Sequence, residues 1–133
     1  MNRLWLNNFS FILALLSTIG AFAADCRNPQ TQTELNQCGA QDLEQLTKEI
    51  NKVYAEYRGR LNESQRQQIK EVQLAWIKFR DLACKFDSSG VVGGSAYSMV
   101  MQSCLSEKTR VRLKELQTLS SCQEGDLSCP AWK

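Results

Sequence analysis

The residues with the most distinctive chemistry in this chain are its six cysteines, in a sequence of 133 residues that contains no histidine. Thiolates and imidazoles are the usual ligands of structural zinc, but no two cysteines are spaced as C-x-x-C and no histidine could complete a site. In a chain this short, six cysteines instead predict three disulfides formed outside the reducing cytosol. We therefore expect no metal site.

Catalytic chemistry has few candidate residues. Histidine, the commonest general base and the usual triad partner, is missing. The sequence also lacks the S-x-x-K, G-x-S-x-G, phosphate-loop and H-E-x-x-H motifs. Glu56 and Glu63 could serve as an acid-base pair, but carboxylates are common on the solvated faces of helices. We expect no catalytic residue, no cofactor and no enzymatic activity.

Two further groups of residues could bind a ligand. Gly90, Gly93 and Gly94 precede an expected helix and could cradle an anion at its N-terminus. They follow a helix rather than a strand, however, and no Lys-Ser/Thr pair accompanies them, so a helix connector is the better interpretation. Trp76 and Arg80 stand one helical turn apart and could form a cation-π pair. Because Trp76 falls on an apolar face, we expect it in the core, with Arg80 tied to a carboxylate at the rim.

The elements that position these residues are expected to be helices. The stretch 69–86 has apolar side chains at alternating steps of three and four, which is the pattern of a helix seam. Its members are Ile69, Val72, Trp76, Phe79, Ala83 and Phe86. The seam is so aromatic that we expect neighbours on two sides, with this helix at the centre of a small bundle.

Capping signals predict the helices before and after it. Thr31 and Glu34 fit a capping box that starts the first helix, which we expect to end with Gly59 as its C-cap. Asn62 and Gln65 fit a second cap, and Ser95 is expected to cap a third helix that runs to Ser120. The apolar seam of the first helix consists of Leu35, Leu43, Leu46, Ile50, Val53 and Tyr57. The inner side of the third consists of Tyr97, Met101, Cys104, Leu105, Leu116 and Leu119.

Three helices of roughly 25 residues would each be about 38 Å long. Equal lengths and short connections favour an all-α fold, a small disulfide-stapled antiparallel three-helix bundle. Folding the chain at Leu61 brings Cys38 level with Cys84, which predicts a bond between these two. Cys122 with Cys129 closes a short loop in the tail, and the remaining pair is Cys26 with Cys104.

The domain organisation follows from composition. Residues 1–23 have Arg3 before an apolar run and an A-x-A site, so we expect a cleaved signal peptide. Residues 24–120 form the helical domain and residues 121–133 a tail. Asp25 precedes Cys26 where a lipoprotein needs a small residue, so we expect no stable membrane anchor. Without Arg3, 15 basic residues balance 14 acidic ones, which argues against a nucleic-acid partner.

Several motifs resemble the LprI-type lysozyme-inhibitor domain. They are the stretch from Asp25 to Cys38 (DCRNPQTQTELNQC), the stretch from Ala75 to Cys84 (AWIKFRDLAC), Gly93-Gly94-Ser95 and Cys104-Leu105. The resemblance covers about residues 25–116. It implies an exported, mostly helical bacterial domain, periplasmic or secreted, some of whose relatives inhibit lysozyme. The pair Cys122 and Cys129 lies outside the four-cysteine pattern of the family.

We therefore expect a protein partner, and the resemblance points to lysozyme. A lysozyme cleft works with two carboxylates, so an inhibitor needs a narrow element that enters the cleft and satisfies them. The connector 87–95 is the narrowest element expected here. Its candidate partner-binding residues are Ser88, Ser89, Val91, Val92, Gly93, Gly94 and Ser95, with the three serine hydroxyls as donors. Val91 and Val92 either fold back over the end of the bundle or face the partner. The alternative is a periplasmic structural or adaptor module that binds an envelope protein through a helix face. The oligomeric state is left open.

Overall fold

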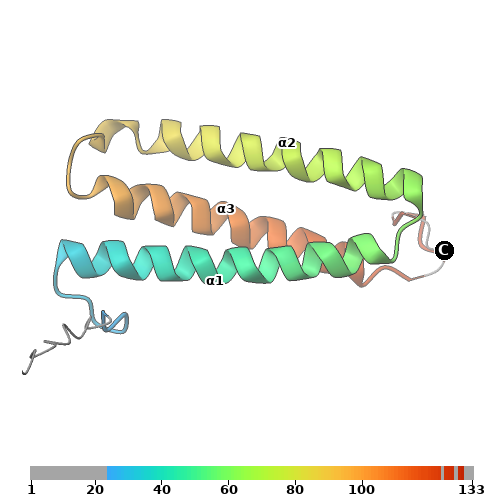
Figure 1. The fold of residues 1–133 in the computed structure, drawn as a ribbon, viewed down its shortest axis with the longest axis horizontal. Helices are drawn as coiled ribbons and strands as arrows, with labels where there is room; N and C mark the ends of the chain where they lie inside the picture. The colour runs from blue at the N-terminus through green and yellow to red at the C-terminus, as the bar shows by residue number, and fades with distance from the viewer. Residues whose placement is uncertain (1–23, 124, 128, 131–133) are drawn as a thin grey trace, which may run out of the picture.

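Three long helices, joined by short connections, make up the computed structural model of this chain (Figure 1). They are α1 (Gln32–Gly59), α2 (Glu63–Asp87) and α3 (Tyr97–Ser120), with a 3₁₀ helix, η1 (Ser89–Val91), between α2 and α3. The structure describes residues 24–123, 125–127, 129 and 130, and these contain no strand. The predicted all-α bundle is confirmed, whereas the expected signal peptide (1–23) lies outside the described residues.

Two of the expected caps are present. The Thr31 hydroxyl accepts the Glu34 amide at 3.2 Å, and the Glu34 carboxylate accepts the Thr31 amide at 3.1 Å. Asn62 and Gln65 make the same reciprocal pair at 3.0 and 3.1 Å. Each box satisfies donors that a helix N-terminus otherwise leaves free, so both starts follow from local sequence.

The other two predicted caps are wrong. Gly59 is the last residue of α1, but the C-cap is Arg60, which keeps right-handed helical angles (φ −87°, ψ −10°). A left-handed glycine cap is not needed there, because the chain turns directly into the buried Leu61. Ala96, rather than Ser95, precedes α3, and it makes no side-chain cap.

The central helix is α3, and the prediction that α2 takes this place is wrong. Chain direction alternates from helix to helix, so α1 and α3 run parallel to each other and antiparallel to α2 (Figure 1). α1 packs closely along α3, α2 packs on α3 more sparsely, and α1 and α2 have little contact. α2 is therefore an outer helix with one covered side.

The core lies toward the end of the bundle where α1 turns into α2. Its buried members come from α1, α3 and the turn between α1 and α2: Leu46, Ile50, Tyr57, Leu61, Leu113 and Leu116. Val53, Tyr54, Ile69, Trp76 and Leu119 pack against them as half-buried residues. The predicted α1 seam thus supplies much of the core. Trp76 joins it from α2, as expected, although its ring is only partly covered.

Half of the predicted α2 seam faces outward. Ile69, Trp76 and Ala83 are half-buried, whereas Val72, Phe79 and Phe86 are exposed. The residues that face α3 are largely polar: Gln73 accepts a hydrogen bond from Arg112 Nε at 3.2 Å, and Arg80 Nη1 donates to Thr109 Oγ1 at 3.4 Å. α2 is therefore held in the bundle by polar contacts with α3, by a disulfide, and by the half-buried Ile69 and Trp76.

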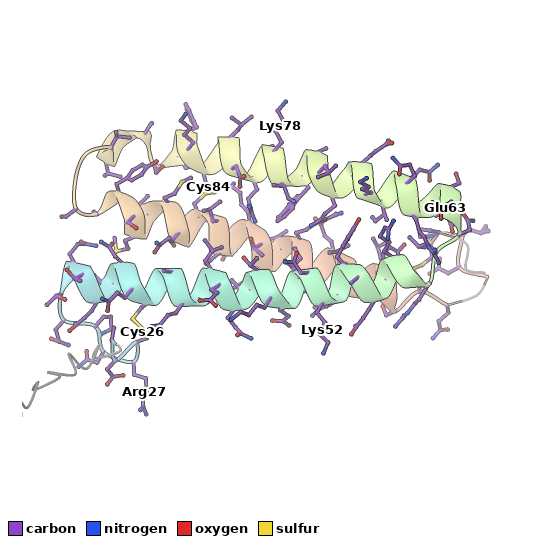
Figure 2. All side chains as sticks on the ribbon, viewed as in Figure 1. Cys26, Arg27, Lys52, Glu63, Lys78 and Cys84 are labelled. Atoms are coloured by element: carbon purple, nitrogen blue, oxygen red, sulfur yellow. A yellow bond between two sulfur atoms is a disulfide. The ribbon has the colours of Figure 1, made fainter. Side chains whose placement is uncertain are left out.

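Two of the three predicted cysteine pairs are wrong. The bonds are Cys26–Cys38 and Cys84–Cys104, whereas Cys122–Cys129 forms as expected. Folding at Leu61 does bring α1 and α2 antiparallel, but α3 is the helix that α2 contacts, so Cys84 meets Cys104 instead of Cys38. Figure 2 shows Cys84 directed toward α3 while Lys78 points away from the bundle.

Candidate protein-binding site

The connector between α2 and α3 forms one end of the bundle, and consecutive turns give it a defined shape. The Val91 amide donates to the Ser88 carbonyl at 3.2 Å, and the Gly94 amide donates to the Val91 carbonyl at 3.1 Å. The Tyr97 amide then donates to the Gly94 carbonyl at 3.2 Å. Gly93 has φ +82°, a conformation that side chains with a Cβ rarely adopt, so this turn requires glycine. These hydrogen bonds give the backbone of the connector a defined conformation.

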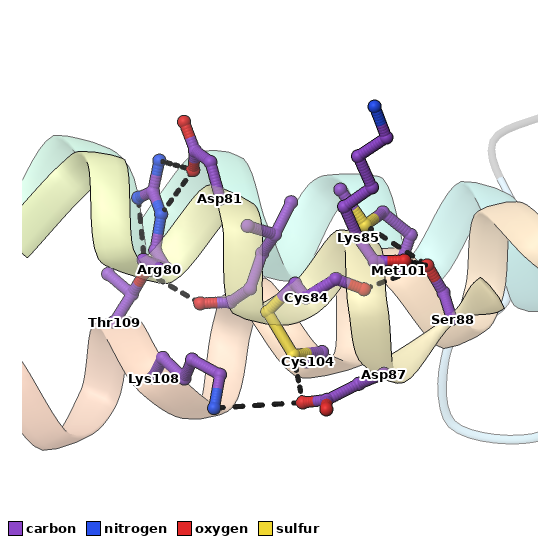
Figure 3. Close-up of a disulfide and its surroundings, with 11 residues drawn as sticks. Arg80, Asp81, Cys84, Lys85, Asp87, Ser88, Met101, Cys104, Lys108 and Thr109 are labelled. Carbon is purple, nitrogen blue, oxygen red and sulfur yellow. Dashed lines mark hydrogen bonds and ion pairs between the residues drawn. A yellow bond between two sulfur atoms is a disulfide. The ribbon is translucent and has the colours of Figure 1, made fainter.

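Contacts from α1 and α3 hold the connector in place. The Asn36 side-chain amide of α1 donates to the Ser95 carbonyl at 3.2 Å. Directly beneath it, the Cys84–Cys104 bond joins the last turn of α2 to α3 (Figure 3). Asp87 lies beside this bond, with its carboxylate 3.7 Å from Lys108 Nζ. A binding element fixed on helix ends loses less conformational entropy when it binds than a free loop does.

Ser88 does not belong to the surface of the connector. The structure buries it completely, and its hydroxyl donates to the Cys84 carbonyl at 2.8 Å, as Figure 3 shows. The expectation that this hydroxyl is a free donor is wrong, because it caps the end of α2. Val91 is half-buried within η1, so it supports the connector more than it presents a contact.

The exposed part of the connector is smaller than predicted. Ser89, Val92, Gly93, Gly94 and Ser95 are exposed, and Val92 is 69% accessible. The hydroxyls of Ser89 and Ser95 have no hydrogen-bond partner within the part of the chain that the structure describes. The tip thus combines one apolar side chain with two available hydroxyl donors.

Among the described residues, the ionisable groups with shifted pKa values lie on α1. The Lys48 ammonium, 2.6 Å from the Glu44 carboxylate, lowers the pKa of Glu44 through a hydrogen bond and its charge. Burial raises the pKa of Tyr57, which lies at the opposite end of the bundle from the connector. Neither group is placed to act on a ligand at the connector.

The pair Trp76 and Arg80 is structural. The Arg80 guanidinium lies 5.1 Å from the centre of the Trp76 ring, within cation-π range. The same guanidinium is 2.8 Å from Asp81 and hydrogen-bonded to Thr109 (Figure 3). The expected carboxylate partner is therefore Asp81, on α2 itself, and the hydrogen bond to Thr109 ties α2 to α3.

Sequence reasoning missed one surface of α2. Four large apolar side chains on this helix, at positions 72, 79, 82 and 86, are exposed along one flank. The sequence shows only that Gln73 and Arg80 are polar, and the structure shows that both face α3. A helix whose inner face is polar leaves its apolar residues outside.

Among the described residues, no three His, Cys, Asp or Glu side chains gather as they would around a metal ion. None of the helices in these residues has the length and apolar character that crossing a membrane requires. Three disulfides are typical of proteins that fold outside the reducing cytosol.

Comparisons with known proteins agree with this description. An uncharacterized protein of Rhizobium meliloti (strain 1021) is 33% identical to this chain over 119 residues, which covers 76% of the chain and 82% of that protein. No solved structure matches the chain significantly. The family model described as lysozyme inhibitor LprI matches residues 24–116, which include all three helices almost to the end of α3. This chain therefore belongs to the lysozyme inhibitor LprI family.

Proposed function

We propose that this protein is a periplasmic or secreted lysozyme inhibitor that occludes the substrate cleft with the connector between α2 and α3. The family supports a lysozyme as the partner, and the disulfides support a location outside the cytosol. In this proposal residues 1–23 act as a signal peptide that is removed on export.

The observation that carries the proposal is the exposure of Val92 at a narrow, well-held turn. An apolar side chain that is 69% accessible has no role in the core, and its backbone is fixed by hydrogen bonds on both sides. A rigid apolar anchor flanked by hydroxyl donors is suited to a cleft that contains carboxylates. Ser89 and Ser95 supply those donors.

Electrostatic steering has little part in this mechanism. The whole chain carries a formal net charge of only +2, so no strong field draws in a charged partner. Shape and hydrogen bonding at the connector must therefore supply the affinity. Inhibition is then expected to depend only weakly on ionic strength.

The experiment is a lysozyme assay on cell walls with the Val92→Asp variant. A carboxylate at position 92 would face the two cleft carboxylates, so inhibition should fall by at least tenfold while the melting temperature stays unchanged. Val92 is the better target than Val91, because Val91 is half-buried and its replacement would disturb η1.

Leu127→Asp is the matched control. Leu127 is a fully exposed aliphatic residue in the C-terminal tail, and the same charge there should leave inhibition intact. If Val92→Asp inhibits as well as the wild type, the connector is not the inhibitory element. If the wild-type protein has no effect on any lysozyme tested, inhibition itself is ruled out as the function of this chain.

A further inference from the structure

One flank of α2 carries an apolar stripe that nothing in the described structure covers. Its residues are Val72, Ala75, Phe79, Leu82 and Phe86, and all five are exposed. Phe79 is 63% and Leu82 is 59% accessible. Their spacing alternates between three and four, the heptad pattern by which one helix packs against another. Single exposed apolar residues are ordinary, but an aligned set of this length marks an interaction surface.

The stripe continues onto α3. Lys108 Nζ lies 5.8 Å from the centre of the Phe79 ring, and Arg112 is hydrogen-bonded to Gln73. Val111, which is 53% accessible, lies between these two residues along α3.

The polar inner side of α2 explains why the apolar stripe is left exposed within one molecule. Gln73 and Arg80 face Arg112 and Thr109, so α2 buries polar atoms against α3. Ile69 and Trp76 are half-buried against the core, whereas Phe79, Leu82 and the other residues of the stripe stay in water. A helix is ordinarily stabilised by burying its apolar face. The stability that α2 does not gain inside one molecule is available from contact with another.

We propose that α2 pairs with α2 of a second copy of this chain, antiparallel, across a two-fold axis near residue 77. Such an isologous interface requires a surface that complements itself. In this register Val72 faces the partner's Leu82, and Ala75 faces the partner's Phe79. The small alanine makes room for the large ring, and symmetry repeats each contact.

Charged residues at the edge of the stripe favour this register. Glu71 lies at the heptad position that brings it next to the partner's Lys85, and symmetry makes this pair twice. Parallel pairing would place Glu71 against Trp76 instead. Lys78 meets its own copy near the axis, but its side chain points away from α1 and α3 and can extend into solvent (Figure 2).

Sedimentation equilibrium of the oxidised, purified protein tests the pairing. The wild type should show a mass that rises from monomer to dimer with concentration. Phe79→Glu should remain a monomer, with the melting temperature that the wild type shows at concentrations where it is monomeric. Leu74→Glu is the matched control, because Leu74 is 57% accessible but lies away from the stripe, and this variant should dimerise normally.

A charge exchange tests the register. Glu71→Lys should weaken dimerisation by about tenfold, since two attractions become repulsions. Adding Lys85→Glu should restore dimerisation.

A monomeric wild type at every concentration, or a Phe79→Glu variant that still dimerises, would overturn the proposal. A double exchange that fails to restore dimerisation would overturn the antiparallel register. If Phe79→Glu abolishes lysozyme inhibition while the wild type is a monomer, the stripe binds lysozyme instead of a second copy.

Discussion

Cys84 on α2 is bonded to Cys104 on α3, and Cys84 is completely buried. Their bond lies in the last turns of α2, immediately before the connector, where Ser88 also reaches back to the Cys84 carbonyl. Besides this bond, α2 is held by polar contacts with α3 and by the partly buried Ile69 and Trp76, which pack against the core. The position of α2, and with it the connector, depends in part on this bond.

The first prediction is that replacing Cys84 and Cys104 together with Ala destabilises the bundle. Closing a loop of 20 residues contributes about 3 kcal/mol in the chain-entropy description. In a domain of this size that corresponds to a fall in melting temperature of more than about 10 °C. Thermal denaturation followed by circular dichroism measures it.

The Cys122→Ala/Cys129→Ala variant is the control for that experiment. This bond closes only a short loop after the end of α3, so its loss should leave the bundle's melting temperature nearly unchanged. Equal effects of the two double variants would contradict the role assigned to the Cys84–Cys104 bond.

The second prediction concerns the close approach of α1 and α3 at Gly39. Alanine normally stabilises a helix interior by about 1 kcal/mol relative to glycine. A Cβ at position 39 would lie 2.6 Å from the Gln102 Oε1 atom, which is buried. Gly39→Ala should therefore stabilise the protein by less than this, because the Gln102 amide must turn away from its hydrogen bond with Ser98, as urea unfolding would show.

The Gln102→Ala variant tests whether the Gln102 side chain limits the effect of Gly39→Ala. In a Gln102→Ala protein the obstructing oxygen is gone, so adding Gly39→Ala should raise the unfolding free energy by roughly 1 kcal/mol over Gln102→Ala alone. The same change in both backgrounds would mean that the contact between Gly39 and Gln102 does not limit the packing of α1 on α3.

The third prediction is a pH dependence that arises from Tyr57. Burial raises the pKa of its phenol, so the folded protein holds this proton more tightly than the unfolded chain does. The stability due to this difference is complete below the unfolded value of about 10 and is lost as the pH rises through the folded pKa. In Tyr57→Phe, the fall in unfolding free energy above about pH 10 should be smaller than in the wild type. An unchanged fall would contradict this assignment.

The starts of α1 and α2 could be predicted because they depend on residues close together in the chain. Thr31 with Glu34, and Asn62 with Gln65, each form a reciprocal cap within four residues. The start of α3 has no such pair. Ser95 contributes its carbonyl to Asn36 of α1 instead, a contact between residues that are 59 positions apart.

The place of α2 could not be predicted because two apolar stripes overlap on it. One contains Ile69 and Trp76 and the other Val72 and Phe79, and periodicity alone does not say which faces inward. The structure resolves this through Arg112 and Thr109 of α3, which bond to polar residues of α2. The cysteine pairing failed for the same reason, since it depends on which helices touch.

Of the candidate site, the location of the connector and the exposure of Val92 agree with the sequence interpretation. The burial of Ser88 does not, because a serine after a helix has the same local signal whether its hydroxyl turns outward or back to the helix carbonyls. The Ser88 hydroxyl also contacts the Met101 sulfur of α3, and this contact cannot be predicted from the local sequence.

The most direct test of the account is the affinity of this protein for lysozyme, measured by calorimetry with and without an oligosaccharide that fills the cleft. If the connector enters the cleft, the two ligands compete, and the affinity for the protein should fall in proportion to the occupancy of the cleft by sugar. An unchanged affinity, with protein and oligosaccharide bound together, would contradict occlusion of the cleft by the connector.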